Sequence, residues 1–83
     1  MDEKIEKPEG NLFPTKDIYF AAALHSLGIY YDGVDKSDKE HQVFMFIGKN
    51  IDEFEKQWIR KELIGNISLY AESVRTFKSI IHK

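Results

Sequence analysis

The stretch from residue 15 to residue 28, Thr-Lys-Asp-Ile-Tyr-Phe-Ala-Ala-Ala-Leu-His-Ser-Leu-Gly, decides the fold because it holds a complete helix followed at once by a strand. Thr15 is the expected N-cap, since its side-chain oxygen can accept a hydrogen bond from a free amide of the first turn. Asp17 places negative charge at the positive end of the helix dipole. Gly28 can adopt the left-handed conformation that closes many helices. A helix is therefore expected from Lys16 to Leu27.

Two runs of strand-forming residues follow this helix. The first is 29–35, Ile-Tyr-Tyr-Asp-Gly-Val-Asp, and the second is 41–47, His-Gln-Val-Phe-Met-Phe-Ile. Both are rich in the β-branched and aromatic residues that favour strands. The five residues between them, 36–40, are polar and show no helical or strand period. The pattern predicts a β-hairpin with a five-residue loop.

Two further helices are expected in the C-terminal half. Asn50 and Glu53 have the spacing of a capping box, which predicts a helix from Ile51 to about Ile64. Ser68 is the expected N-cap of a last helix from Leu69 to His82. Apolar residues recur in that helix at spacings of 4, 3 and 4, as on one helical face: Tyr70, Val74, Phe77 and Ile81.

These elements predict a single small α+β domain over residues 12–83, in the order α-β-β-α-α, with a two-stranded antiparallel hairpin packed on three helices. Residues 1–11 are charged and contain Pro8 and Gly10, so they are expected to form a flexible tail. The expected core is Ile18, Leu24, Leu27, Ile29, Val43, Met45, Ile47, Phe54, Trp58, Val74, Phe77 and Ile81.

The composition is that of an ordinary globular domain, with 42% hydrophobic and 31% charged residues in 83. The net charge of −2 and the pI of 5.9 argue against a polybasic nucleic-acid coat. The absence of cysteine excludes disulfides, thiolate nucleophiles and cysteine-based zinc sites. No apolar run reaches the ~20 residues of a membrane span and the charged N-terminus lacks a signal-peptide core, so a cytoplasmic location is expected.

The residue types that carry catalysis are present but scattered. His25, His41 and His82 show no spacing typical of metal ligands, so no metal site is expected. Asp32 and Asp35 lie in and near the hairpin, where acids are usually solvated. The chain has no glycine-rich phosphate loop and no serine elbow motif. We therefore expect a protein that is not an enzyme and uses no cofactor.

The second strand of the hairpin is apolar on both faces, which suggests a partner surface. Val43, Met45 and Ile47 alternate with Phe44 and Phe46 along the strand. Either helices cover both faces of the hairpin, or a second molecule covers one of them. We assign Val43, Met45 and Ile47 to the core. The candidate partner surface is therefore Phe44, Phe46 and Tyr30.

A weak basic flank on the last helix is the alternative site. Arg75, Lys78 and His82 have spacings of 3 and 4, which place them on one side of the helix. Arg60 and Lys61 can extend this flank. Such a flank could bind the phosphates of a nucleic-acid backbone. The overall negative charge of the protein opposes this binding.

The chain resembles a family of short phage and bacterial proteins catalogued as domain of unknown function five-six-five-nine. The resemblance covers residues 13–82 and is carried by the opening Thr-x-Asp-x-Tyr-x-Ala-Ala-x-Leu of residues 15–24, Leu27-Gly28, an aromatic second strand around Phe44 and Phe46, and Arg75 and Lys78 near the end. It implies an accessory protein of a phage or mobile element that occupies a surface of a host factor or of nucleic acid. The expected function is non-enzymatic protein–protein contact or self-association, and the alternative is nucleic-acid binding.

Overall fold

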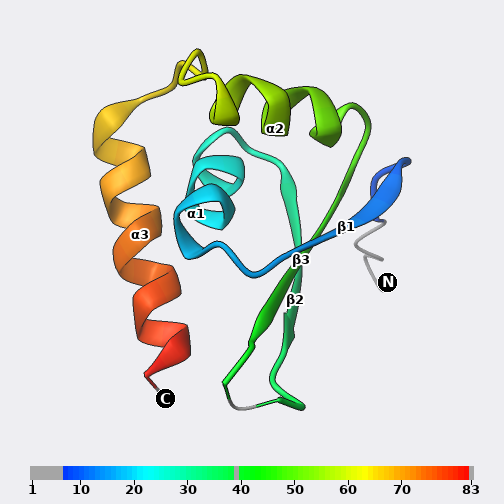
Figure 1. Ribbon diagram of the computed structural model, residues 1–83, viewed down its shortest axis with the longest axis vertical. Helices are drawn as coiled ribbons and strands as arrows, with labels where there is room; N and C mark the ends of the chain where they lie inside the picture. Colours follow the sequence, from blue (N-terminus) through cyan, green and yellow to red (C-terminus); the bar gives the residue numbers. More distant parts are fainter. Residues whose placement is uncertain (1–6, 39, 83) are drawn as a thin grey trace, which may run out of the picture.

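The computed structural model describes residues 7–38 and 40–82, which form a small α+β fold. A three-stranded antiparallel sheet in the order β1-β3-β2 is covered by three helices, and α1 lies between α3 and the sheet (Figure 1). The elements are β1 (Asn11–Thr15), α1 (Ile18–Ser26), β2 (Tyr30–Asp35), β3 (Val43–Gly48), α2 (Ile51–Ile59) and α3 (Ile67–Ile81). The α+β class confirms the sequence prediction. β2 and β3 pair as expected, but residues 36–42 connect them and not the predicted loop 36–40, and the hairpin is part of a larger sheet.

The strand β1 was missed by the sequence analysis, so the sheet has three strands and not two. Pro14 hides it, because proline lacks the N–H that a central strand donates and is confined to sheet edges or bulges. β1 is such an edge, paired only with β3, where Pro14 lies opposite Met45. At its start a Cβ on Gly10, which has φ of 140°, would collide with the backbone of Gly48. Only glycine fits this approach.

The boundary of the predicted tail also needs correction. Residues 1–6 lie outside the described part of the chain. Asn11 is the first residue of β1. Before it, Lys7 Nζ lies 3.0 Å from Asp32 Oδ1 of β2, and Glu9 Oε2 lies 3.2 Å from Lys49 Nζ. Residues 7–11 therefore belong to the folded unit.

The helix α1 has the predicted extent to within two residues but a different cap. Asp17 is the N-cap, and its carboxylate accepts hydrogen bonds from the N–H groups of Tyr19 and Phe20 at 2.9 and 3.2 Å. Thr15 acts one step earlier, where its hydroxyl oxygen accepts the N–H of Asp17 at 3.1 Å. Gly28 has φ of 84°, the left-handed conformation expected after the helix.

The helix α2 ends at Ile59 and not near Ile64, and the predicted capping box does not form. Asn50 is itself left-handed, with φ of 63°, and its side chain makes no capping hydrogen bond. Lys61 is left-handed as well, with φ of 61°, which turns the chain out of the helix. The following residues run to Asn66, whose side chain accepts the N–H of Leu69 at 3.0 Å and caps α3 in place of Ser68.

The core lies on the face of β3 that carries Phe44 and Phe46, the opposite face from the one predicted. Both rings are buried, whereas Val43, Met45 and Ile47 are only half-buried on the other side of the strand. Alternation could not distinguish two faces that are both apolar. Phe77 and Leu24 are fully buried as predicted, and six other predicted core residues pack partly buried against this cluster: Ile18, Ile29, Phe54, Trp58, Val74 and Ile81.

Phe77 of α3 is the centre of the core. Its ring packs edge-on against Phe44 at 5.0 Å, Tyr31 at 5.2 Å and His25 at 5.5 Å between ring centroids. Such edge-to-face pairs add to the gain from burial alone. The three alanines at 21–23 of α1 are also buried, which lets α1 lie close to its neighbours. The helices and the inner face of the sheet are thus joined around one aromatic side chain.

Candidate functional site

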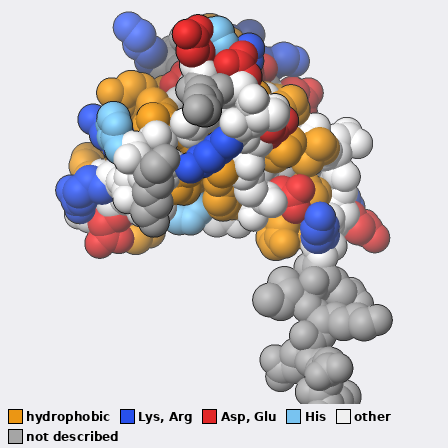
Figure 2. Space-filling model, turned by 90° about the horizontal axis from the view of Figure 1, so that it is seen from below, with side chains coloured by type: hydrophobic (Ala, Val, Ile, Leu, Met, Phe, Trp, Pro, Cys, Tyr) orange, Lys and Arg blue, Asp and Glu red, His pale blue; other side chains and the backbone are white. Residues whose placement is uncertain are grey.

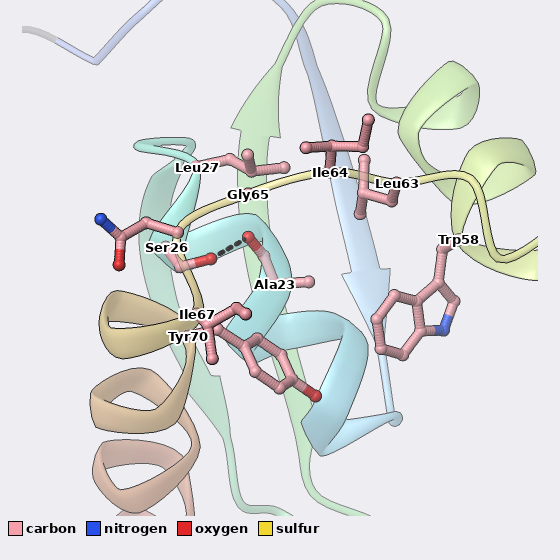
Figure 3. Close-up of a pocket in the computed structure, with 10 residues that line it drawn as sticks. Ala23, Ser26, Leu27, Trp58, Leu63, Ile64, Gly65, Ile67 and Tyr70 are labelled. Carbon is pink, nitrogen blue, oxygen red and sulfur yellow. Dashed lines mark hydrogen bonds between the residues drawn. The ribbon is translucent and has the colours of Figure 1, made fainter.

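An open crevice of about 230 Å³ lies where the end of α1 meets the segment between α2 and α3 (Figure 3). We call residues 60–66 the linker and this hollow the linker crevice. One wall comes from α1 and its end, another from α2, and the rest from the linker and the first turns of α3. The lining residues are Ala23, Ser26, Leu27, Trp58, Leu63, Ile64, Gly65, Asn66, Ile67 and Tyr70.

The walls of the linker crevice are apolar, with two aromatic rings among them. The ring centroids of Trp58 and Tyr70 are 6.4 Å apart, and Trp58 also packs against Phe20 at 5.8 Å. The hydroxyl of Ser26 donates to the Ala23 carbonyl oxygen at 2.8 Å (Figure 3). No charged side chain lines this crevice among the described residues. Its chemistry is therefore that of a socket for an apolar group.

Exposed hydrophobic side chains occur in the lining of this socket and in the segments next to it. Ile64 is 86% exposed and Ile67 is 84% exposed, and both line the crevice. Ile59 at the end of α2 and Leu69 in the first turn of α3 are exposed too. We call these four side chains the apolar rim. Scattered exposed hydrophobic residues are ordinary, but two exposed isoleucines in the lining of a hollow are typical of a contact surface.

The linker backbone has few internal hydrogen bonds. Its last described backbone bond runs from the Glu62 N–H to the Gln57 carbonyl at 2.8 Å, and the next runs from the Tyr70 N–H to the Asn66 carbonyl at 2.9 Å. Between them the half-buried Leu63 packs against the core. Segments with few backbone bonds and few buried contacts open at low free-energy cost. The crevice therefore has one compliant wall.

The predicted partner surface is divided between the two faces of the sheet. Phe44 and Phe46 are 1% and 0% exposed, so they cannot meet a partner while the domain is folded; the prediction was wrong because it assigned them to the outer face. Tyr30 lies opposite Ile47 in the register and belongs to the outer face. The apolar residues of that face are Leu12, Pro14, Tyr30, Val43, Met45 and Ile47.

The helices cover one face of the sheet and not both. None of the six outer-face residues belongs to the core cluster or packs against it. Tyr30, Val43, Met45 and Ile47 are half-buried, and Pro14 is exposed but small. Leu12 is the one large hydrophobic residue of this face that is more than half exposed, at 55%. The outer face is thus a less open surface than the apolar rim.

The predicted basic flank is split into two groups. Arg75 and Lys78 are exposed on α3, with Lys78 Nζ 5.8 Å from the centre of the Tyr19 ring, and His82 follows the helix. Arg60 and Lys61 lie instead at the start of the linker, near the other end of α3 (Figure 1). At 1.5 Å per residue, Arg75 and Lys78 lie about 12 and 17 Å along α3 from its first residue, Ile67, which is at the linker end of the helix.

The surface at the hairpin end of the molecule is mixed in charge. Viewed from there, Lys, Arg, Asp and Glu side chains of the described residues are interspersed with hydrophobic ones (Figure 2). His41 Nδ1 lies 3.0 Å from Asp38 Oδ2 in the exposed loop. The pKa of the Asp38 carboxyl is held below its usual value, first by the N–H of Glu40 that donates to it and then by His41. The described residues at this end create no field of uniform sign that would attract a polyanion.

A serine–histidine pair is the arrangement that the sequence analysis missed. The Ser73 hydroxyl and His25 Nδ1 are 2.8 Å apart across the contact of α3 and α1. Ser73 is 4% exposed and neither side chain lines the linker crevice. The position of Ser73 on the buried stripe of α3, between Tyr70 and Phe77, is the signal that could have found it. The pair satisfies a buried hydroxyl and joins two helices.

Within 7–38 and 40–82 no group of three or more histidine, aspartate or glutamate side chains is placed to hold a metal ion. No helix in that part of the chain is long and apolar enough to cross a membrane.

Comparison with known proteins adds no assignment to this geometry. No family model, no curated protein and no solved structure matches the chain. The resemblance to the family of unknown function therefore stays a prediction.

Proposed function

We propose that the protein is a non-enzymatic binding domain that acts through protein–protein contact, with the linker crevice and the apolar rim as its contact surface. The observation that carries this proposal is the combination of an apolar socket, walled by Trp58 and Tyr70, with two isoleucines that are 86% and 84% exposed beside it. Interfaces characteristically place aromatic residues in a central apolar patch.

The size of the socket favours a side chain over a cofactor. Pockets for drug-sized ligands are roughly 300–1,000 Å³, and an apolar cavity of about 150 Å³ holds benzene. The linker crevice, at about 230 Å³, matches one aromatic or branched aliphatic side chain. No charged side chain lines it among the described residues, and its Ser26 hydroxyl and Asn66 side-chain carbonyl oxygen are already hydrogen-bonded to backbone groups. A protein that offers one apolar anchor is the partner that fits.

The energetics allow binding of moderate strength. Burying one large apolar side chain contributes roughly 1.5–3 kcal/mol, so covering the four residues of the rim contributes on the order of 4–8 kcal/mol after allowing for their partial exposure. Association costs about 4–15 kcal/mol in lost freedom. The rim alone thus gives a weak complex, and an anchor that fills the socket supplies the remainder.

Selection from a random-peptide display library tests this proposal. We expect the wild-type protein to enrich peptides with an aromatic or branched apolar anchor, and the Ile64→Glu/Ile67→Glu variant not to enrich them. Binding should shift the emission of Trp58, the single tryptophan. The matched control is Leu12→Glu, another exposed hydrophobic position outside the crevice. Equal enrichment on the wild type and the double variant would contradict the proposal.

Nucleic-acid binding is the second candidate, favoured by one observation. Lys78 lies over the ring of Tyr19, which is 47% exposed, and Arg75 is on the same helix. A base stacked on an aromatic ring beside cations is a mode of single-strand binding. We expect at most weak, salt-sensitive affinity for oligothymidine. Tight binding that an Arg75→Ala/Lys78→Ala variant loses while remaining folded would rank this function first.

The wider setting of the protein also remains a proposal. Origin in a phage or mobile element and modulation of a host factor rest on the resemblance of residues 13–82. A cytoplasmic location rests on the sequence in the same way.

A further inference from the structure

We propose that the occupant of the linker crevice is a second copy of this chain, joined in a twofold-symmetric dimer in which Ile64 of each protomer enters the crevice of the other. This inference rests on the proposed function, whose partner it names. It follows from the shape of the patch, from its charges and from its extent.

The patch has the two features that a twofold contact requires. In such a contact the same surface of both copies must be complementary to itself. The linker provides a projecting side chain, Ile64, which is 86% exposed, directly beside a hollow that matches one branched aliphatic side chain. A surface that held only the hollow would need a partner with a different shape. Here the projecting side chain and the hollow belong to the same surface of the protein.

The charges beside the rim are also self-complementary. Arg60, Lys61 and Glu62 are consecutive and exposed, and none of them forms an ion pair with another described residue. A twofold axis brings the linker of one copy against the linker of the other, so cations and the carboxylate can be paired across it. A patch made for a strongly acidic or strongly basic partner would carry one sign.

The patch lies in a continuous exposed segment of the chain. Ten of the eleven residues from 59 to 69 are exposed. A standard interface covers about 800 Å² on each partner, so a stable dimer would cover roughly one eighth of the 6305 Å² surface of the protein.

The sheet is a less suitable surface than the linker for binding a second copy. The edge strand β1 carries Pro14, which has no N–H to donate. The other edge, β2, has an irregular register between Tyr31 and Gly33, which interrupts the row of backbone groups. Of the large hydrophobic residues on the outer face, only Leu12 is more than half exposed. Self-association through the linker is therefore favoured over pairing through the sheet.

Sedimentation velocity on the full chain from about 1 µM to about 1 mM tests the proposal directly, since weak interfaces dissociate in this range. We expect a reversible monomer–dimer equilibrium, with a blue shift of Trp58 emission as the dimer forms. Ile64→Glu should weaken dimerisation at least about tenfold. Leu12→Glu should dimerise like the wild type. Circular dichroism checks that both variants are folded.

A charge exchange examines the twofold geometry. Lys61→Glu and Glu62→Lys should each weaken the homodimer, and an equimolar mixture of the two variants should recover association. Self-association that is unchanged in both single variants would contradict the pairing across the axis.

The possible failures separate this inference from the proposed function. A wild-type protein that stays monomeric up to about 1 mM, a range that covers weak specific interfaces, overturns the dimer. If that monomer still selects peptides that shift Trp58 emission, the proposed function stands with a foreign partner. A dimer that Leu12→Glu abolishes and Ile64→Glu spares would place the interface on the outer sheet face and overturn this proposal.

Discussion

Phe77 and Trp58 are the central aromatic residues of two regions that differ in how completely side chains of the protein pack around them. Phe77 is fully buried, with three rings within 5.5 Å of its own. Trp58 is half-buried, and its ring neighbours Phe20 and Tyr70 lie at 5.8 and 6.4 Å. Around Phe77 the chain fills its own space. Around Trp58 it leaves a crevice with exposed isoleucines beside it. This open side is available for contact with a second molecule.

The difference has a physical origin in the lengths and faces of the helices. α3 has 15 residues and lies along α1, whose buried alanines permit a close approach. α2 has nine residues and ends where Lys61 turns into the left-handed conformation. The chain then needs the linker to reach α3, and an irregular segment cannot present a continuous apolar face. The unfilled space therefore lies under the linker.

Removal of the Phe77 ring should have the largest effect. Phe77→Ala leaves a cavity among four aromatic rings and should lower the free energy of unfolding by about 3–5 kcal/mol, a large part of the stability of so small a domain. Urea unfolding followed by circular dichroism measures this loss. Ser79→Ala, at an exposed position of the same helix outside the linker crevice, is the control and should change stability by less than about 0.5 kcal/mol. A Phe77→Ala protein that unfolds at the wild-type urea concentration would contradict the central place of Phe77.

The two faces of β3 provide the next largest contrast. Phe46→Ala should cost about 3–5 kcal/mol because the ring is fully buried, and Met45→Ala should cost about 1–2 kcal/mol because that side chain is half-buried on the outer face. The same urea experiment compares the neighbouring positions. Equal losses would mean that something covers the outer face as completely as the helices cover the inner one, as an interface there would do.

The sequence predicted the class of fold and the approximate extents of α1 and α3 because their signals are local. The glycine stop of α1 and the 4-3-4 spacing of α3 depend on neighbouring residues only, and the structure has a helix at each place. The third strand could not be predicted in this way. β1 contains Pro14 and becomes a strand only through pairing with β3, from which it is separated by about thirty residues in the chain.

The candidate site was less predictable than the fold. The orientation of β3 depends on which of two apolar faces meets the helices, and that is a tertiary fact. The linker crevice forms because α2 ends early, at Ile59, and Lys61 then turns the chain although lysine has no intrinsic preference for the left-handed conformation. Ile64 and Ile67, as hydrophobic residues next to Gly65-Asn66, were the available signal: large apolar side chains in a helix-breaking segment are candidates for exposure.

Truncation of Trp58 sharpens the comparison from the side of the crevice. A buried tryptophan replaced by alanine costs about 3–5 kcal/mol, and because Trp58 is half-buried we expect Trp58→Ala to cost about 1–3 kcal/mol, less than Phe77→Ala. If a second copy fills the crevice, the melting temperature of the wild type should also rise with protein concentration, since binding stabilises the folded state. Thermal unfolding at two concentrations tests both statements. A loss larger than that of Phe77→Ala would show that the region around Trp58 is the true core.

The smallest expected effect is on the dependence of stability on pH. Burial against Phe77 and Phe46 raises the pKa of the Tyr31 hydroxyl above its ordinary value of about 10. The folded state therefore keeps this proton at a pH where the unfolded chain has lost it, so the stabilisation that comes from the neutral phenol is complete below about pH 10 and decreases as the pH rises through the folded-state pKa. Tyr31→Phe removes the titrating group while keeping the ring, and we expect its free energy of unfolding to fall less than that of the wild type between about pH 9 and 11. Urea unfolding across this range measures the difference. Parallel curves for the two proteins would mean that the Tyr31 hydroxyl is solvated in the folded state, so that only the ring of Tyr31 belongs to the aromatic core.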